Sequence, residues 1–108
     1  MYEPFTVAVE RGDGVARVLV AGELDLATVP ELEAGLPAPS PGETLVLDLR
    51  ELAFIDSSGI RVLMRLDLDS RERGWTLVVV RACPSVQRVL DLVRLGDRVR
   101  LVDEPAEA

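Results

Sequence analysis

The chain contains no histidine and no lysine among its 108 residues, and it contains one cysteine. Histidine is the usual general base and the commonest metal ligand, and lysine is a main alternative base for a serine nucleophile. The Gly-x-Ser-x-Gly elbow of serine hydrolases is also absent. The lone Cys83 excludes an internal disulfide and fits a reducing compartment. We therefore expect a protein without enzymatic activity, bound metal or cofactor.

Aromatic residues are scarce too, with two Phe, one Tyr and one Trp. Because 48% of the residues are nevertheless apolar, the core must be aliphatic, and the length suits a single domain. The 19 acidic and 12 basic residues give a net charge of −7, which argues against binding to nucleic acid or to an anionic membrane. We find no signal peptide and no apolar run of membrane-spanning length. We expect a cytoplasmic protein, monomeric when free, whose partners are other proteins.

In the first half of the chain, the spacing of the apolar residues changes once, from a strand pattern to a helix pattern. Residues 5–20 alternate apolar and polar positions around Asp13-Gly14, which predicts a β-hairpin turned at that dipeptide. From Thr28 onward the spacing is helical, and Thr28 with Glu31 matches the capping box of a helix start. Three prolines within residues 37–41 end this helix.

The second half alternates strands and helices. Continuous apolar runs at 45–49 and 75–80 predict buried strands of a parallel sheet. Helices are predicted from about residue 57 to 74 and over 84–96, and a short strand at 99–102.

The element order β-β-α-β-α-β-α-β predicts one α/β domain over residues 1–108. Its mixed sheet should have four to five strands, an N-terminal hairpin followed by parallel strands, with about three helices. Right-handed crossovers that advance in one direction place these helices mainly on one face. The acidic tail 103–108 is expected to be mobile.

Residues 56–59, Asp-Ser-Ser-Gly, stand where a strand gives way to a helix. Free backbone N–H groups and the positive end of the helix dipole favour an added negative charge there, and a serine is easily modified. We expect Ser58 to cap the helix, a contribution of roughly 1 kcal/mol. Gly59 costs about 1 kcal/mol relative to alanine, which suggests that something approaches its backbone closely.

The helix after Gly59 carries an apolar arc wider than one core-facing stripe needs. Two interpretations stay open. Either the helix is packed between neighbours on the sheet, or the excess around Val62 and Leu66, flanked by Arg61 and Arg65, is a partner surface.

Asp25 and Asp56 each follow the carboxyl end of a predicted strand, where recognition sites gather in α/β folds. We therefore place Asp25 near Asp56 and take Asp25, Asp56, Ser57, Ser58 and Gly59 as partner-binding candidates. A carboxylate pair can hold Mg²⁺, but two acids are a weak metal signal, and we assign no metal. Cys83 precedes Pro84 at a helix start, and we interpret it as a small buried hydrophobe.

These motifs resemble a known family. Gly22-Glu23-Leu24-Asp25 with Thr28, the strand 45–49, the step 56–59 and the helix 84–96 follow the order and spacing of the STAS domain, specifically the stand-alone anti-sigma factor antagonists of bacteria. The resemblance covers nearly the whole chain.

The resemblance implies a phosphorylation switch. An anti-sigma factor that is also a serine kinase binds the unmodified antagonist, phosphorylation of the first serine of the step breaks the complex, and a serine phosphatase reverses it. Carried over, that serine is Ser57, with Asp56 beside it. The helix that faces the kinase carries Asp67 and Asp69, where relatives more often have basic or aromatic residues.

Two other functions are compatible with the sequence. The first is a constitutive STAS scaffold, or an accessory subunit of a transporter or signalling assembly, in which the serines only cap the helix. The second is a nucleotide-binding module, which the lack of a P-loop or a Gly-x-Gly-x-x-Gly motif disfavours.

Overall fold

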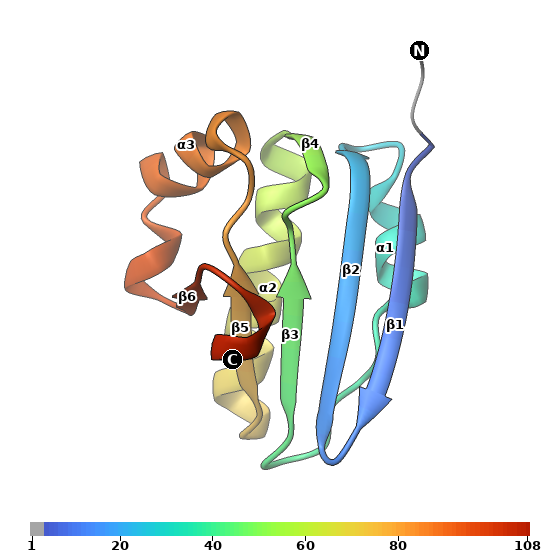
Figure 1. Ribbon diagram of the computed structural model, residues 1–108, viewed down its shortest axis with the longest axis vertical. Helices are drawn as coiled ribbons and strands as arrows, with labels where there is room; N and C mark the ends of the chain where they lie inside the picture. Colours follow the sequence, from blue (N-terminus) through green and yellow to red (C-terminus); the bar gives the residue numbers. More distant parts are fainter. Residues whose placement is uncertain (1–3) are drawn as a thin grey trace.

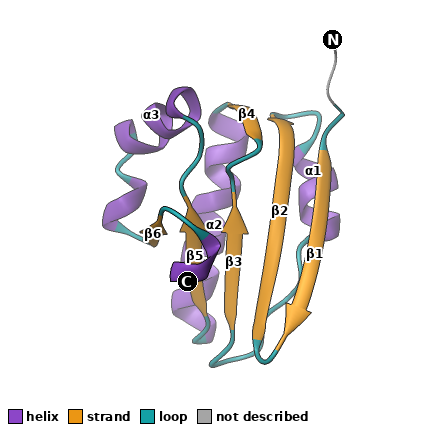
Figure 2. Ribbon diagram, in the orientation of Figure 1, coloured by secondary structure: helices purple, strands orange, loops and turns teal. Residues whose placement is uncertain are grey.

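A computed structural model describes residues 4–108 as one mixed sheet with a layer of helices behind it (Figures 1 and 2). The strands are β1 (Thr6–Gly12), β2 (Val15–Leu24), β3 (Thr44–Asp48), β4 (Leu52–Ile55), β5 (Thr76–Val80) and β6 (Arg100–Val102). The helices are α1 (Val29–Gly35), α2 (Ser57–Arg73) and α3 (Pro84–Leu92), with short 3₁₀ turns η1 (Leu95–Asp97) and η2 (Pro105–Glu107).

β1 and β2 form the predicted antiparallel hairpin, with Gly12 opposite Val15. Asp13 and Gly14 make the turn, with φ values of 46° and 75°. Two consecutive positive φ angles give a turn whose twist matches that of the two strands, and Asp-Gly is a preferred sequence for it. The hairpin and its turn are therefore confirmed.

The sheet has the order β1-β2-β3-β5-β6, and the strands from β2 onward are parallel. β3 and β5 are adjacent central strands, as predicted, with Leu45 beside Leu77 and Leu47 beside Val79. These leucines and valines face the helices and join buried side chains of all three, so the α/β fold with its helices on one face is confirmed (Figure 1).

Within residues 4–108, β4 brings the total to six strands, one more than the predicted upper limit. It pairs with the end of β2, where Leu24 lies beside Ile55, while the first half of β2 pairs with β3. The sequence pattern predicts no strand here because the apolar run between Glu51 and Asp56 is only four residues long.

Gly74 ends α2 as predicted, with φ 78° and its N–H donated to the Ser70 carbonyl. α3 ends at Leu92, before the predicted residue 96, because Arg94 adopts the left-handed conformation and starts the 3₁₀ turn. Within residues 4–108, no helix combines the length and apolar character needed to cross a bilayer.

The acidic tail, expected to be mobile, is described as the turn η2 on the sheet face opposite the helices (Figure 1). The Glu107 side chain accepts hydrogen bonds from the backbone N–H groups of Asp103 and Glu104. Arg81 forms an ion pair with Asp103 at 3.1 Å. The tail is thus folded back on the domain.

Candidate functional site

Asp25 and Asp56 begin two neighbouring loops at one end of the sheet. The residues before them, Leu24 and Ile55, are paired in adjacent strands, and the Asp56 N–H donates to the Leu24 carbonyl at 3.2 Å. The loop after Asp25 leads into α1, and the step at Asp56 leads directly into α2. Both helices therefore start beside each other at this edge.

The carboxylate of Asp25 is turned into its own loop. Its Oδ1 accepts hydrogen bonds from the N–H groups of Ala27 and Thr28, at 3.0 and 3.2 Å. The Thr28 hydroxyl donates to the Glu23 carbonyl at 2.7 Å and accepts from the Asp25 N–H at 3.0 Å. Thr28 makes no cap bond to α1, so the predicted capping box with Glu31 is wrong: the hydroxyl binds backward along the chain.

Asp56, and not Ser58, is the N-cap of α2. Its Oδ1 accepts hydrogen bonds from the N–H groups of Ser58 and Gly59, at 2.8 and 3.3 Å. The prediction of Ser58 as the cap is therefore wrong, because α2 begins at Ser57, two residues before the start that a cap at Ser58 would give. Ser57 is the first helical residue and is exposed, whereas Ser58 is half-buried.

Gly59 is buried against the chain's own core. A Cβ at this position would lie 2.7 Å from Cγ1 of Ile55 and 2.8 Å from Cγ of Leu24. The close approach inferred from the sequence is real, but the approaching atoms belong to β4 and β2. Gly59 therefore brings α2 close to the sheet and has no surface to offer a partner.

The exposed side of α2 differs from the predicted one. Val62 is only 2% exposed and belongs to the core, so its assignment to a partner surface is wrong. Leu66 is half-buried, and the exposed apolar residue is Leu68, at 56%. Arg61 and Arg65 are exposed, as the partner-surface interpretation requires.

A groove of about 420 Å³ runs between α1 and α2. Leu66 and Leu68 line it, and the ion pair between Arg65 and Glu33, 3.5 Å long, lies at its rim. Arg65 and Leu66 thus lie on a hollowed surface between α1 and α2.

Asp67 and Asp69 of α2 form their contacts within the domain. Asp67 is buried and forms ion pairs with Arg71 and Arg98, at 3.0 and 3.6 Å. Asp69 accepts a hydrogen bond from the indole N–H of Trp75 at 2.9 Å. Asp67 therefore fastens α2 to the segment before β6, and its charge is neutralised within the domain.

Two exposed apolar residues near the ends of β2 and β4 were not identified from the sequence. Leu26, directly after Asp25, is 75% exposed, and Phe54 on β4 is 46% exposed beside Glu23. A large apolar residue in a loop, between Asp25 and Ala27, was a signal for Leu26. Phe54 carried none, because its exposure depends on the unpredicted strand β4.

Cys83 lies at the N-cap of α3 and is half-buried. Its Sγ is 3.4 Å from the Leu52 carbonyl oxygen and 3.5 Å from the Ser85 hydroxyl. The hydrogen bond with Ser85 is the main reason that the pKa of the thiol lies below its ordinary value. The interpretation of Cys83 as a buried hydrophobe is therefore wrong in part: the side chain packs on the core but keeps a polar, accessible edge.

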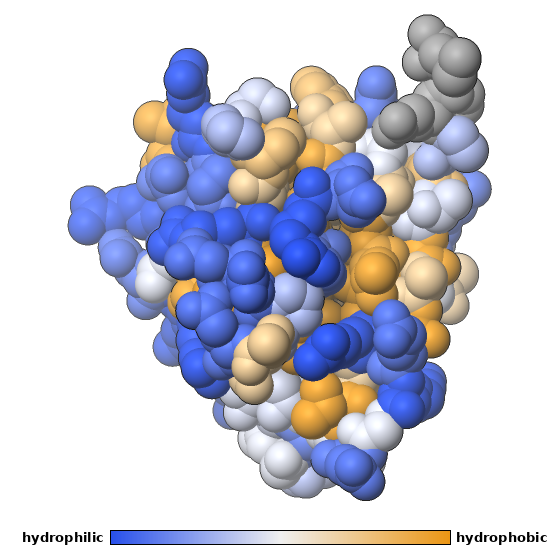
Figure 3. Space-filling model, viewed as in Figure 1, coloured by the Kyte–Doolittle hydropathy of each residue, from blue (hydrophilic) through white to orange (hydrophobic). Residues whose placement is uncertain are grey.

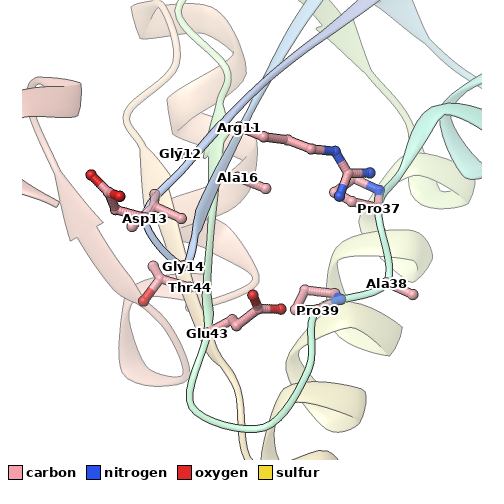
Figure 4. Close-up of a pocket in the computed structure, with 11 residues that line it drawn as sticks. Arg11, Gly12, Asp13, Gly14, Ala16, Pro37, Ala38, Pro39, Glu43 and Thr44 are labelled. Carbon is pink, nitrogen blue, oxygen red and sulfur yellow. The ribbon is translucent and has the colours of Figure 1, made fainter.

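A hollow of about 310 Å³ lies at the opposite end of the sheet, between the hairpin turn and the loop after α1 (Figure 4). Arg11 points across it toward Pro37, and Glu43 lies near Pro39 (Figure 4). It is remote from Ser57, which follows the other end of the strands. In the described part of the chain, no group of three or more acids and cysteines is placed to hold a metal ion.

Known proteins share sequence similarity with this chain. The family model described as "Mlab, STAS domain" matches residues 7–103. The anti-sigma-B factor antagonist of Listeria monocytogenes is 28% identical over 100 residues, covering 91% of this chain and 88% of the relative.

Two solved structures share the fold. The crystal structure of an anti-sigma factor antagonist from Mycobacterium paratuberculosis has a TM-score of 0.80 and 31% identity, covering 99% of this chain and 94% of its own. The anti-sigma factor antagonist SpoIIAA in its unphosphorylated form has a TM-score of 0.71 and 21% identity, covering 94% and 92%. With a family match over nearly the whole length and the same fold, the chain belongs to the STAS domain family.

Proposed function

We propose that this protein is an anti-sigma factor antagonist switched by phosphorylation of Ser57. In its unmodified form it binds an anti-sigma factor that is also a serine kinase, in the cytoplasm, and a serine phosphatase restores it after modification. It works by binding and not by catalysis. The observation that carries the proposal is the exposed Ser57 hydroxyl at the first residue of α2, beside a carboxylate that already caps the helix.

This geometry explains why a phosphate at Ser57 acts on the partner. The helix N-terminus would otherwise attract the phosphate, but the N–H groups of Ser58 and Gly59 already donate to Asp56. The phosphate therefore stays at the surface with about −1.5 to −2 charges, beside the negative charge of Asp56. A partner that contacts unmodified Ser57 meets this charge directly.

The expected loss of binding free energy is large enough to release the partner. A change of 1.4 kcal/mol in binding free energy is tenfold in affinity, so a few kcal/mol of repulsion and lost packing release the partner. α2 itself should not move, because a negative group near its N-terminus is compatible with the helix dipole.

The surface around Ser57 has the composition of a protein interface. Leu26 and Phe54 are exposed apolar residues near the ends of β2 and β4, the edge at which α2 begins, and Arg61 lies one helical turn after Ser57 along α2. Apolar and aromatic residues bordered by charges are typical of such contact surfaces. We propose that the contact extends along α2 to Arg65 and Leu66.

The experiment compares Ser57→Ala with Ser58→Ala as its matched control. Each protein is incubated with a purified candidate anti-sigma kinase, and the complex is followed by gel filtration before and after ATP. Wild type and Ser58→Ala should bind and then be released by ATP, while Ser57→Ala should bind and stay bound. If ATP releases Ser57→Ala as readily as wild type, the switch is not at Ser57. If ATP releases none of the three proteins from the kinase, the interpretation as a constitutive scaffold replaces the phosphorylation switch.

A further inference from the structure

The sheet face opposite the helices carries two lateral rows of side chains set by the strand register. One row runs Arg17, Val46, Val78, Arg100 across β2, β3, β5 and β6. The next runs Leu19, Asp48, Val80, Val102. Laterally paired residues share a face, so an arginine stands at each end of a valine pair in the first row. We call this surface the valine face.

The tail is held over the valine face by arginines from separate parts of the sheet. Arg17 and Arg100 donate to the backbone carbonyls of Pro105 and Glu107, and Arg81 pairs with Asp103. Arg50 is paired with Asp48, a residue of the second row. Arg17, Arg81 and Arg100 therefore each bind a different tail residue.

The apolar residues below the tail stay buried only if another segment covers them. Val46, Val78, Val80 and Val102 form a buried cluster separate from the core under the helices. No helix contributes to this cluster, and η2 is the element that lies over this side (Figure 1). The tail thus occupies an apolar and basic surface in a protein that otherwise carries an excess of acid.

The valine face continues past the tail. A hollow of about 440 Å³ between the hairpin and Ala108 is lined by Val15, Arg17 and Val46. Its hairpin side also carries Arg11 and the acids Glu10 and Asp13. Figure 3 shows an apolar strip over β1 and β2 beside the polar residues of the tail, and Leu19 lies half-buried on this face. A longer segment than the tail therefore finds further apolar contacts along the same direction.

We propose that the valine face is a binding surface for acidic peptide segments, and that residues 103–108 occupy it in cis. The partner is an acidic, proline-containing segment of another protein that presents carboxylates and backbone carbonyls to Arg17, Arg81 and Arg100. Charge complementarity supports this choice, because the arginines of this face attract carboxylates and repel basic segments. The tail then acts as an internal competitor.

A tethered segment competes with an effective concentration on the order of millimolar. An external hexapeptide should therefore bind weakly while the tail is in place and detectably once the tail is displaced. Because the contacts are largely ionic and exposed, binding should also weaken as salt rises.

The test uses the full chain with methyl-labelled valines and NMR. The double variant Asp103→Lys with Glu107→Lys removes the ion pair with Arg81 and the side chain that binds two tail N–H groups. Resonances of Val46, Val78 and Val80 should shift, while those of Val62 and Val86 under the helices should not. The control Glu33→Lys with Glu72→Lys makes the same charge change on the helix layer and should leave the valine face unchanged.

The probe is the peptide Asp-Glu-Pro-Ala-Glu-Ala, with Lys-Lys-Pro-Ala-Lys-Ala as the reversed-charge peptide. The acidic peptide should return the shifted resonances toward their wild-type positions, with at least about fivefold higher affinity for the tail variant than for wild type. Further charge reversal at Arg100→Glu should abolish this binding. Melting curves establish that each variant is folded, and Asp103→Lys alone serves as a milder displacement if the double variant is not.

Unchanged valine resonances in a folded tail variant overturn the proposal, because the tail then does not cover the face. Equal binding of the acidic and basic peptides overturns it as well. If the resonances shift but the acidic peptide does not bind at millimolar concentration, the tail is only a structural part of the domain.

Discussion

Asp56 Oδ1 lies 2.8 Å from the backbone nitrogen of Ser58, so the aspartate that precedes the two serines caps α2. This contact leaves the hydroxyl of Ser57 free at the surface and makes the cap independent of the residue that we propose to be modified. Removal of the cap should cost about 1 kcal/mol of unfolding free energy in Asp56→Ala, and much less in Asp56→Asn, which keeps an acceptor oxygen. Urea unfolding measures both.

Ser58→Ala is the companion measurement for the cap. Because Ser58 donates its N–H and not its side chain, this variant should change the unfolding free energy by less than about 0.5 kcal/mol. A loss at Ser58 as large as that of Asp56→Ala would restore the serine as the cap and contradict the structure.

Gly59→Ala should destabilise the protein despite the higher helix propensity of alanine. The added Cβ would meet Ile55 and Leu24 at under 3 Å, and overpacking of this kind costs roughly 1–3 kcal/mol, against a propensity gain of about 1. Gly12→Ala is the control, since an added Cβ there has no neighbour within 4 Å. A Gly59→Ala variant more stable than wild type would show that the helix can move away from the sheet at little expense.

Val62→Asp and Leu68→Asp separate core from surface on α2. Val62 is 2% exposed, so an unpaired carboxylate there should abolish cooperative thermal unfolding, whereas Leu68, at 56%, should accept it with little loss. Leu66→Asp should weaken binding to the anti-sigma factor in a protein that still melts cooperatively. Normal partner affinity of a folded Leu66→Asp variant would remove that residue from the contact surface.

Cys83 should react with a thiol reagent faster at neutral pH than an ordinary cysteine of equal exposure. The hydrogen bond with Ser85 lowers the pKa of the thiol, and the thiolate is the reactive form. Ser85→Ala should raise the pKa, so that the rate of labelling at neutral pH falls and its pH profile moves upward. An unchanged profile in Ser85→Ala would show that the serine does not set the reactivity.

Most of the fold could be predicted because its signals are local. A few consecutive residues are enough to predict each of three features: the Asp13-Gly14 turn, the strands β3 and β5 with their apolar runs, and the glycine that ends α2. β4 could not be predicted, because its four residues become a strand only through pairing with β2. The exposure of Phe54 follows from that pairing and was hidden with it.

The candidate site was predicted in part for the same reason. The sequence places Asp25 and Asp56 at strand ends, but only the structure shows where each carboxylate binds. The Asp25 carboxylate accepts from N–H groups of its own loop, and the Asp56 carboxylate accepts from N–H groups at the start of α2. The rotation of α2 about its axis, which buries Val62 and exposes Leu68, depends on how closely Gly59 approaches β2 and β4. The N-cap lies at Asp56, two residues before the predicted Ser58, and a shift of this size at a helix start changes which side chain caps the helix.

The most direct test of the central proposal is the affinity of the anti-sigma factor for this protein with and without a phosphate on Ser57. Titration calorimetry on the unmodified protein and on protein phosphorylated stoichiometrically at Ser57, verified by mass spectrometry, should show affinity lowered at least about thirtyfold, or ~2 kcal/mol. Circular dichroism of the two forms should agree, because α2 keeps its Asp56 cap. Equal affinities of the two forms would contradict the switch and leave a STAS domain that binds its partner constitutively.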